Sequence, residues 1–281
     1  MNKHFEALAV SCLLFAGFGF AGSGNALAQG QAGGTTPPPK VLLLLNEGLK
    51  PGRGGNMHAK TESAFVQAFS AANWQQHYFG MDALSGKARS LFLVGYPSFE
   101  EYQKDIDATR KNPTLSAALD SASVADGDLL DTFENSIYAF REDLSLRAPV
   151  KIEDMRYMDI SVFQIRPGHR KDWETLSKLY VKAFEKMPDA HWATFEKMYG
   201  TGSGGRYIAV SPMKSLAEVD ASMKDQEKFA SVVSAEDMQK IRELTASTIE
   251  SVESHLFAIN PKISYPPDSW VKGAPDFWGQ K

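Results

Sequence analysis

The chain has 281 residues, of which 43% are hydrophobic and 23% are charged, so it can form one large domain or two small ones with an ordinary packed core. Its formal net charge is −4 and its charges are interspersed, which argues against a nucleic-acid-binding protein and against a disordered acidic tail. The single cysteine, Cys12, lies near the N-terminus, so the rest of the chain has no disulfide, thiolate metal site or cysteine nucleophile.

A signal peptide is predicted over residues 1–28. Lys3 precedes an apolar run over residues 8–21, and Ala26-Leu27-Ala28 forms a small-x-small cleavage site. The run is shorter than the roughly 20 apolar residues that a membrane span needs. We therefore expect cleavage after Ala28, a periplasmic or secreted mature protein, and no stable membrane span. The alternative is an N-terminal anchor that stays attached.

Residues 29–39, QGQAGGTTPPP, have no apolar periodicity and end in consecutive prolines. This composition predicts a disordered linker, so the folded part is expected to start near Lys40.

The folded part contains an internal repeat. A shared order of features occurs in residues 40–148 and again in residues 155–264, with an offset that runs from 116 (Lys50 to Arg166) to 118 (Ser136 to Ser254). Such self-similarity predicts a duplicated unit. The matched pieces are Lys50-Pro51-Gly52 with Arg166-Pro167-Gly168, Asn73-Trp74 with His191-Trp192, residues 91–94 with 207–210, residues 98–101 with 215–218, and residues 136–140 with 254–258.

Each unit has the same predicted order of elements. Short β-branched and apolar runs predict strands, and a Pro-Gly turn ends the first strand of each unit. The predicted strands are residues 41–47, 74–81, 90–95 and 135–140 in the first unit, and residues 157–165, 192–199, 206–211 and 255–259 in the second.

Helices are predicted after each Pro-Gly turn and again after the third strand of each unit. Trp173, Leu176 and Tyr180 recur at helical spacing. Ser98 and Ser215 each begin an S-x-x-E capping box, which marks a helix start. Pro113 is predicted to break the helix that starts at Ser98, and a further helix is predicted from Ser234.

This order predicts an α+β fold of two tandem ferredoxin-like βαββαβ units, each a four-stranded antiparallel sheet with its helices on one face. The predicted fold also bears on whether the G-x-G-x-x-G pattern of Gly200, Gly202 and Gly205 is a dinucleotide-binding loop. A dinucleotide-binding loop needs a helix after its glycines, whereas residues 206–211 are predicted to be a strand. We therefore predict a hairpin connection there.

The chain resembles the dimeric α/β-barrel superfamily. The resemblance covers about residues 40–264 and rests on the [KR]-P-G turns, the repeated Trp74 and Trp192, and the capped helix after a strand that ends in proline. It implies that the two units pair their sheets into one barrel within the chain. The superfamily includes cofactor-free monooxygenases, muconolactone isomerases, and haem-binding chlorite-dismutase-like proteins and dye-decolourising peroxidases, so it implies no single activity.

Alternation along the strands predicts which face lines the barrel. In the second unit, Met158, Ile160, Val162, Ile208 and Val210 are expected to meet the helices. The opposite face is expected to line a pocket for a small molecule, because its aromatic and polar mixture suits one. That face carries Tyr157, Asp159, Ser161, Phe163, Tyr207 and Ala209. In the first unit the barrel-lining residues are expected to be apolar: Val41, Leu43, Leu45, Leu91 and Leu93.

Asp159 and His191 are the candidate catalytic residues. A carboxylate in mid-strand is costly to bury without a partner, so Asp159 could be a general base with a raised pKa. The alternative is a structural pair with Arg206 or Lys197. His191 could move protons, or it could be an edge residue of the sheet.

The candidate ligand-binding residues are Tyr157, Ser161, Trp192, Tyr207 and His255. His255 follows the parity of Phe257 and Ile259, so it is either a core histidine or an axial ligand if haem binds. His58 follows Gly54-Gly55-Asn56 and is expected to be solvated in a loop. No two histidines have the close spacing of a zinc motif, and no metal is predicted.

Residues 265–281 form the last predicted segment. They carry Trp270, Phe277 and Trp278 among prolines and have no periodicity. We expect an aromatic tail that wraps over the folded body or reaches another chain.

Three functions stay open on the sequence. The first is an exported α/β-barrel protein that binds a small apolar or aromatic molecule in a pocket of the second unit, and that transforms it without a cofactor if it is an enzyme. The second is a haem-binding oxidoreductase with His255 or His191 as axial ligand. The third is a non-catalytic exported scaffold with a filled barrel. No cofactor and no nucleic-acid partner are predicted, and a homo-oligomer is an open expectation.

Overall fold

The structure, a computed structural model, describes residues 34–279, apart from the side chains of residues 225–227. The predicted signal peptide and the start of the predicted linker lie outside the described residues. The first half of the fold contains β1 (Val41–Leu49), α2 (Asn56–Ala71), β2 (Tyr78–Ala83), β3 (Arg89–Tyr96), α3 (Phe99–Arg110), α4 (Pro113–Gly127) and β4 (Leu130–Phe140). The second half contains β5 (Tyr157–Ile165), α5 (Arg170–Phe184), β6 (Ala193–Gly200), β7 (Arg206–Met213), α6 (Ala217–Val232), α7 (Ala235–Thr248) and β8 (Ile249–Tyr265). Two 3₁₀ turns, η1 (Glu142–Leu144) and η2 (Ile152–Asp154), join the halves, and α8 (Asp268–Gly273) and α9 (Pro275–Trp278) follow β8.

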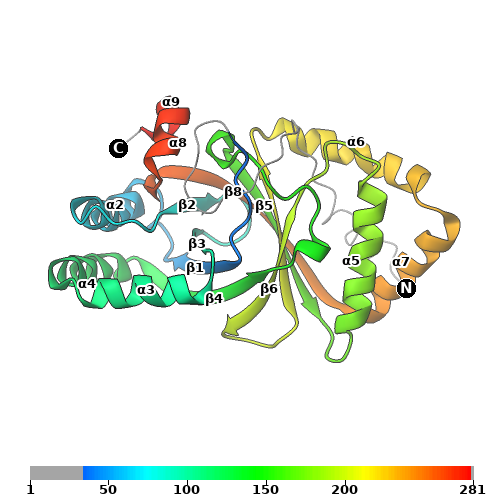
Figure 1. Cartoon of the computed structure of the whole chain (residues 1–281), viewed down its shortest axis with the longest axis horizontal. Coiled ribbons are helices and arrows are strands. Elements are labelled where there is room, and N and C mark those ends of the chain that lie inside the picture. The colour runs from blue at the N-terminus through cyan, green and yellow to red at the C-terminus, as the bar shows by residue number, and fades with distance from the viewer. Residues whose placement is uncertain (1–33, 280–281) are drawn as a thin grey trace.

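The strands form one closed barrel in the order β1-β3-β2-β8-β5-β7-β6-β4 (Figure 1). Each half contributes a run of neighbours, β4-β1-β3-β2 and β8-β5-β7-β6. The runs join where β2 pairs with β8 and where β4 pairs with β6, and both of these pairs are antiparallel. The α+β class and the intrachain barrel are therefore confirmed.

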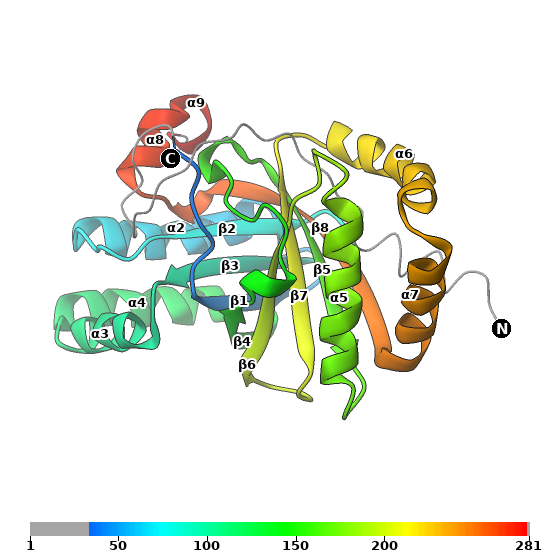
Figure 2. The same cartoon turned by 45° about the vertical axis from the view of Figure 1, so that its right-hand side comes forward.

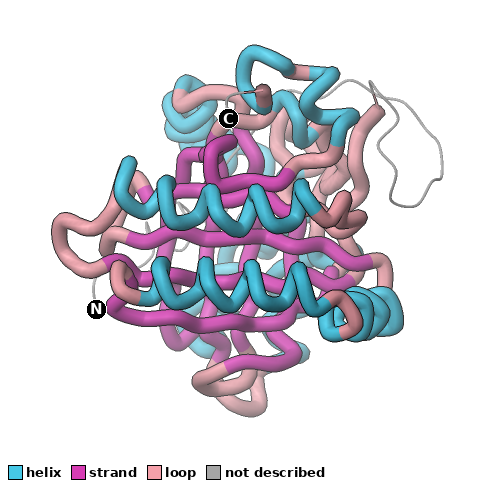
Figure 3. Tube along the Cα trace, turned by 90° about the vertical axis from the view of Figure 1, so that its left-hand side faces the viewer, coloured by secondary structure: helices cyan, strands magenta, loops and turns pink. Residues whose placement is uncertain are grey.

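The helices lie outside the barrel. Figures 1 and 2 show α2, α3 and α4 on one side, and α5, α6 and α7 on the other. Figure 3, which looks onto the first half, shows helices that cover the strands and run along them. The core between the second-half strands and their helices is rich in aromatic side chains, among them Trp173, Tyr180, Phe184 and Phe229.

The strand faces in the second half are the reverse of the prediction. Met158, Ile160, Ile208 and Val210 belong to the apolar cluster inside the barrel, whereas Phe163 belongs to the core under the helices. Tyr207 and Ala209 also lie under the helices, so they do not line the barrel. The prediction failed because the inside of a closed barrel excludes water, so the most apolar face turns inward rather than toward the helices.

In the first half, the prediction of which strand face lines the barrel was correct for β3 and wrong for β1. Leu91 and Leu93 line the barrel, as expected. Leu42 and Leu44 do so in β1, whereas Val41, Leu43 and Leu45 pack on the outer side. The strand is apolar on both faces, so its sequence has no alternation from which the inner face could be chosen.

Local signals explain most of the element boundaries. The Ser98 hydroxyl accepts a hydrogen bond from the Glu101 amide, and Ser234 caps α7 in the same way through Asp237. Pro113 ends one helix and begins the next as its first residue. Only half of the capping box at Ser215 forms, because Glu218 accepts from the Ser215 amide while the helix starts after Leu216.

The glycine-rich stretch is a hairpin connection, as predicted. It joins β6 to β7, which pair antiparallel. Gly202 and Gly205 have positive φ angles of 84° and 75°, a region that favours glycine. A strand, not a helix, follows, so the phosphate-cradling geometry is absent from this described segment.

Both ends of the described chain pack on the barrel. Thr36 pairs with Val150, so residues 36–39 of the predicted linker are not a free tether. The C-terminal tail wraps over the folded body, which was the first of the two arrangements expected for it. Trp278 is buried and joins the cluster that fills the barrel. Within the described residues, none of the helices combines the length and hydropathy required to cross a membrane.

Candidate functional site

The predicted site residues do not come together. The strand order places Tyr157, Asp159, Ser161 and Tyr207 on the outer face of the second half, and His255 on the inner face. Trp192 and Tyr207 belong to the aromatic core under α5, where Tyr207 lies 5.3 Å from the ring of Trp173. Burial and the charge of Glu196 raise the pKa of Tyr207 to about 12.

The carboxyl group of Asp159 is buried with an oxygen that has no hydrogen-bond partner among the described residues. The residue is 4% exposed, and the oxygen without a partner is Oδ1. Burial raises the pKa of Asp159 to about 7. The alternative pairing with Arg206 or Lys197 is wrong, because those residues share the parity of Ile208 and Phe195 inside the barrel.

His191 and Ser161 are held by local contacts. The Nε2 atom of His191 lies 2.9 Å from the carbonyl oxygen of Pro212, so this nitrogen carries the proton and donates. The hydroxyl of Ser161 lies 3.3 Å from that of Ser254 on the neighbouring strand. Tyr157 is half-buried at the start of β5.

A cavity of about 10 Å³ lies in the aromatic core of the second half. Trp173 Nε1 and Ser177 Oγ line it and lack hydrogen-bond partners among the described residues. A space of this size holds about one water molecule. The cavity is too small for an organic ligand. Its remaining lining residues are Leu144, Phe163, Tyr180, Trp192, Thr194 and Ala209.

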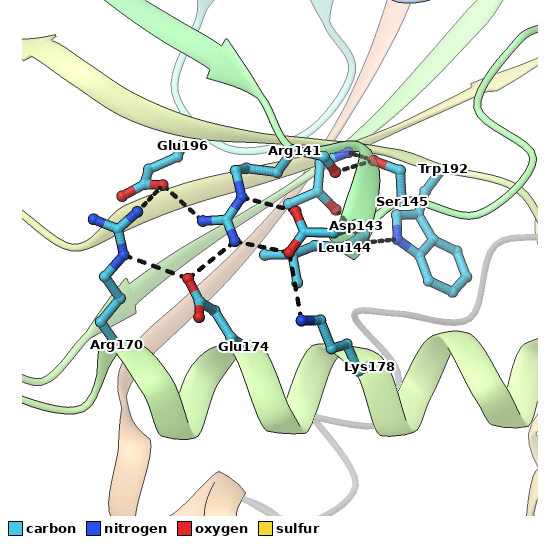
Figure 4. A network of polar contacts seen from close by, with 10 residues as sticks. Arg141, Asp143, Leu144, Ser145, Arg170, Glu174, Lys178, Trp192 and Glu196 are labelled. Atoms are coloured by element: carbon cyan, nitrogen blue, oxygen red, sulfur yellow. Dashed lines mark hydrogen bonds and ion pairs between the residues drawn. The ribbon is translucent and has the colours of Figure 1, made fainter.

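A network of ion pairs joins the start of η1, just after β4, to β6 and α5 beside this core (Figure 4). Arg141 contacts Asp143 at 2.9 Å, Glu174 at 2.9 Å and Glu196 at 2.8 Å. Arg170 contacts Glu196 from the first turn of α5. The network fixes α5 against the junction of the two halves, which is a structural role.

Arg141→Met should lower the free energy of unfolding by about 2 kcal/mol, because it leaves the half-buried Glu196 with one fewer charge-assisted hydrogen bond. Urea unfolding measures this. Lys104→Met, which removes exposed ion pairs on α3, is the matched control and should leave stability unchanged. Equal effects of the two substitutions would contradict the role of Arg141.

The inner face carries a different set of polar residues at the end of the barrel opposite the tail. Side chains two or four residues apart on a strand point to the same face. Each residue of this set either stands at that spacing from an apolar residue that lines the barrel, or pairs across strands with a residue that does, so it faces inward. We call this set the polar end: Asn46, Arg89, Glu134, Lys197, Arg206, Glu253 and His255.

Two buried atoms of the polar end have no partner among the described residues. They are the Nε donor of Arg206 and the Oδ1 acceptor of Asn46. Burial and the charge of Arg206 lower the pKa of Lys197, and burial lowers that of Arg89. Lys197 and Arg206 therefore repel each other, and Arg89 is incompletely solvated.

His255 is the one predicted site residue that reaches the polar end. Its Nε2 atom lies 3.1 Å from Glu253, and its ring packs 6.4 Å from that of Phe257. Burial and the charge of Arg89 lower the pKa of His255. From the sequence, Lys197 and Arg206 were named only as partners of Asp159. The other members were not identified as site residues, because they stand near strand ends, where a charged residue is usually solvated.

A second polar group, on the outer face of the first half, was also missed. His58 is 1% exposed and lies within α2, so its expected place in a solvated loop is wrong. It contacts Glu47 of β1, Glu62 of α2 and Asp126 of α4, and all of these are buried. Burial, together with the charges of Glu47 and Asp126, raises the pKa of Glu62 to about 10.

Comparisons with known proteins support the fold. No protein-family model matches the chain, and no curated protein sequence matches it. A candidate monooxygenase from Fusobacterium nucleatum subsp. nucleatum ATCC 25586 superposes with a TM-score of 0.51 at 10% identity, over 78% of this chain and 91% of that one. An anthrone oxidase-like protein superposes with a TM-score of 0.50 at 15% identity, over 78% and 91%.

At such identities these likenesses show the fold alone. They confirm the barrel fold that the resemblance implied, and no family is assigned. Activity therefore has to be argued from the residues of this chain.

The residues do not fit haem at either candidate ligand. Beside His255 the barrel is filled by the ring of Phe257, and the guanidinium of Arg89 lies 5.3 Å from the centre of that ring. The Nε2 atom of His255 already has a hydrogen-bond partner, the carboxylate of Glu253. His191 donates its Nε2 proton to a backbone carbonyl, so that nitrogen has no lone pair for iron. A haem would need a broad apolar slot, which the packed aromatic core of the second half does not provide.

Proposed function

We propose that the protein binds a small organic anion with an apolar or aromatic body at the polar end of the barrel. The observation that carries this proposal is the buried Nε donor of Arg206, which has no partner in the described residues. A buried donor without a partner costs about 1–3 kcal/mol, and a bound carboxylate would remove that cost.

The charges of the polar end favour an anion. Arg89, Lys197 and Arg206 bring three cations, whereas Glu134 and Glu253 are both exposed and well solvated. Burial and the charge of Arg206 lower the pKa of Lys197, so these two cations lie close enough to repel each other. An anion beside Lys197 and Arg206 would relieve this repulsion, and a guanidinium suits a carboxylate in geometry as well as in charge.

The walls next to these charges favour an apolar body. Leu91, Ile208 and Phe257 line the interior immediately beyond the polar residues. The opposite end is closed by the tail, where Trp278 packs against Trp270 at 5.3 Å. A ligand would therefore enter from the polar end and would contact both halves, not the second half alone as the sequence suggested.

1-Naphthoate, an aromatic carboxylate, is the probe for this site. We expect it to bind the full chain in a calorimetric titration, and we expect Arg206→Gln to weaken binding at least tenfold through loss of a charge-assisted hydrogen bond. Its neutral analogue 1-naphthalenemethanol should bind at least tenfold more weakly than the acid.

Arg242→Gln is the matched control, because Arg242 is exposed on α7 and far from the barrel interior in the fold. The proposal fails if the two arginine variants bind 1-naphthoate equally, or if the alcohol binds as well as the acid. No binding of either probe would favour the scaffold hypothesis, which the packed middle of the barrel also supports.

We propose export with cleavage after Ala28, origin of residues 40–148 and 155–264 by duplication of a ferredoxin-like unit, self-association, and any chemistry proceeding without a cofactor. Asp159 and His191 lie outside the polar end and take no part in the proposed binding. The mass of the secreted chain tests the cleavage site, and sedimentation tests self-association.

A further inference from the structure

We propose that Glu47, His58, Glu62 and Asp126 form a binding site for one divalent transition-metal cation beneath α2 and α4. Each residue offers one ligand atom, and these atoms all lie within 4.8 Å of one another. From His58 Nε2 the distances are 3.1 Å to Glu47, 3.5 Å to Asp126 and 3.9 Å to Glu62. Bonds of about 2.1 Å in tetrahedral geometry place ligand atoms about 3.4 Å apart. The His58 distances are close to this value, and the widest pair, within 4.8 Å, would have to close by at most about 1.4 Å.

Glu62 supplies an independent sign of a missing ligand. Its side chain is 3% exposed, and its Oε1 atom, which is directed at His58, has no hydrogen-bond partner among the described residues. A buried carboxylate oxygen without a donor is costly, and a cation at this point would satisfy it.

The contacts around the cluster orient the ligands. The Nδ1 atom of His58 lies 3.4 Å from the hydroxyl of Ser90, which donates to Asp82 at 2.6 Å. Because the Ser90 hydroxyl gives its proton to Asp82, it can accept one from Nδ1 of His58. In the metal-free chain Nε2 donates to Glu47 at 3.1 Å, and a bound cation would take the place of that proton. Thr61 donates to Asp126 Oδ1 at 2.6 Å. Outer contacts that hold a histidine and a carboxylate in this way are typical of metal sites.

The second half shows that the fold does not need charges here. Phe163 is the seventh residue of β5, as Glu47 is of β1, and the residue across from it is Tyr207 where β1 has Ser90. Trp173 of α5 packs on Phe163 at 4.9 Å. Aromatic packing therefore fills the corresponding layer, and the charged cluster of the first half calls for a separate explanation.

The donor set indicates the class of metal. Three carboxylates and one imidazole suit Mn²⁺, Fe²⁺ or Zn²⁺, whereas Ca²⁺ prefers six to eight oxygen ligands. The carboxylates come from β1, α2 and α4, so a bound cation would tie two outer helices to the barrel wall. The site is thus structural by position, and it lies on the outer face, away from the inward-facing polar end.

Thermal unfolding and calorimetry of the full chain, stripped with EDTA and then supplied with MnCl₂ or ZnCl₂, test this proposal. We expect one ion per chain and a rise in melting temperature of about 5 °C or more at a hundredfold excess over Kd. Glu62→Gln keeps the shape of the side chain and removes a ligand charge, so it should fold and should weaken binding at least tenfold.

Asp159→Asn is the matched control, because it also alters a buried carboxylate with an unpartnered oxygen but lies outside the cluster. It should bind metal like the parent chain. The proposal is overturned if neither ion raises the melting temperature, if Glu62→Gln binds metal as tightly as the parent, or if Ca²⁺ stabilises the protein more than Mn²⁺ and Zn²⁺ do.

Discussion

Trp278→Ala is expected to lower the free energy of unfolding by about 3–5 kcal/mol, the usual cost of truncating a large buried aromatic residue. Trp278 is 2% exposed although it lies almost at the end of the described chain. Its ring packs against Phe277 at 5.0 Å and Trp270 at 5.3 Å, and its Nε1 donates to the carbonyl of Glu153 at 2.9 Å. The substitution removes all of these contacts and opens one end of the barrel.

Urea unfolding followed by fluorescence and by circular dichroism measures this effect. Phe133→Ala is the control, because Phe133 is an aromatic residue of β4 that is 54% exposed, and its loss should change stability little. A loss below about 1 kcal/mol for Trp278→Ala would show that the tail does not close the barrel in solution.

Asp159→Asn should stabilise the protein by about 4 kcal/mol at pH 8 and by almost nothing at pH 4. The pKa of Asp159 in the fold is raised by burial to about 7 from an ordinary 3.8. As the pH rises through this window, the unfolded chain loses the proton first, so ionisation favours unfolding. A difference of about three pKa units, at 1.36 kcal/mol each, corresponds to about 4 kcal/mol of unfolding free energy. The parent protein has lost all of this stability above about pH 7, where Asp159 is ionised in the fold as well.

The measurement is the difference in unfolding free energy between the two proteins at several pH values from 4 to 8. The difference isolates Asp159 because the other carboxylates, such as Asp143 and Glu174 beside Arg141, are the same in both. A difference that does not change with pH would contradict the raised pKa.

Much of the fold could be predicted from the sequence because its signals are local. The turns at Gly52 and Gly168, which have φ angles of 76° and 86°, follow matching strands, and Ser98 and Ser234 cap their helices. The strand faces could not be predicted in the same way. A strand such as β1 is apolar on both sides, and only closure of the barrel decides which side excludes water more completely.

The polar residues show a second limit. Glu47 and Asp126 are far apart in the sequence, and only the packing of α4 beside α2 brings them to His58. The spacing of His58 and Glu62, four residues apart, was the available signal, but α2 starts without a side-chain cap, so the helix containing both was hard to locate. Arg206 has the strand parity of Ile208 and Val210, and those two residues were assigned to the helix face although they line the barrel interior.

The side-chain Nε–H signal of Arg206 in a ¹⁵N-correlated NMR spectrum tests the central claim most directly. If the polar end binds organic anions, saturating 1-naphthoate should shift this signal strongly, and it should shift the signal of the exposed Arg242 little. An unchanged Arg206 signal, with the largest shifts instead at residues of α5 or β6 on the outer face, would contradict the proposed site.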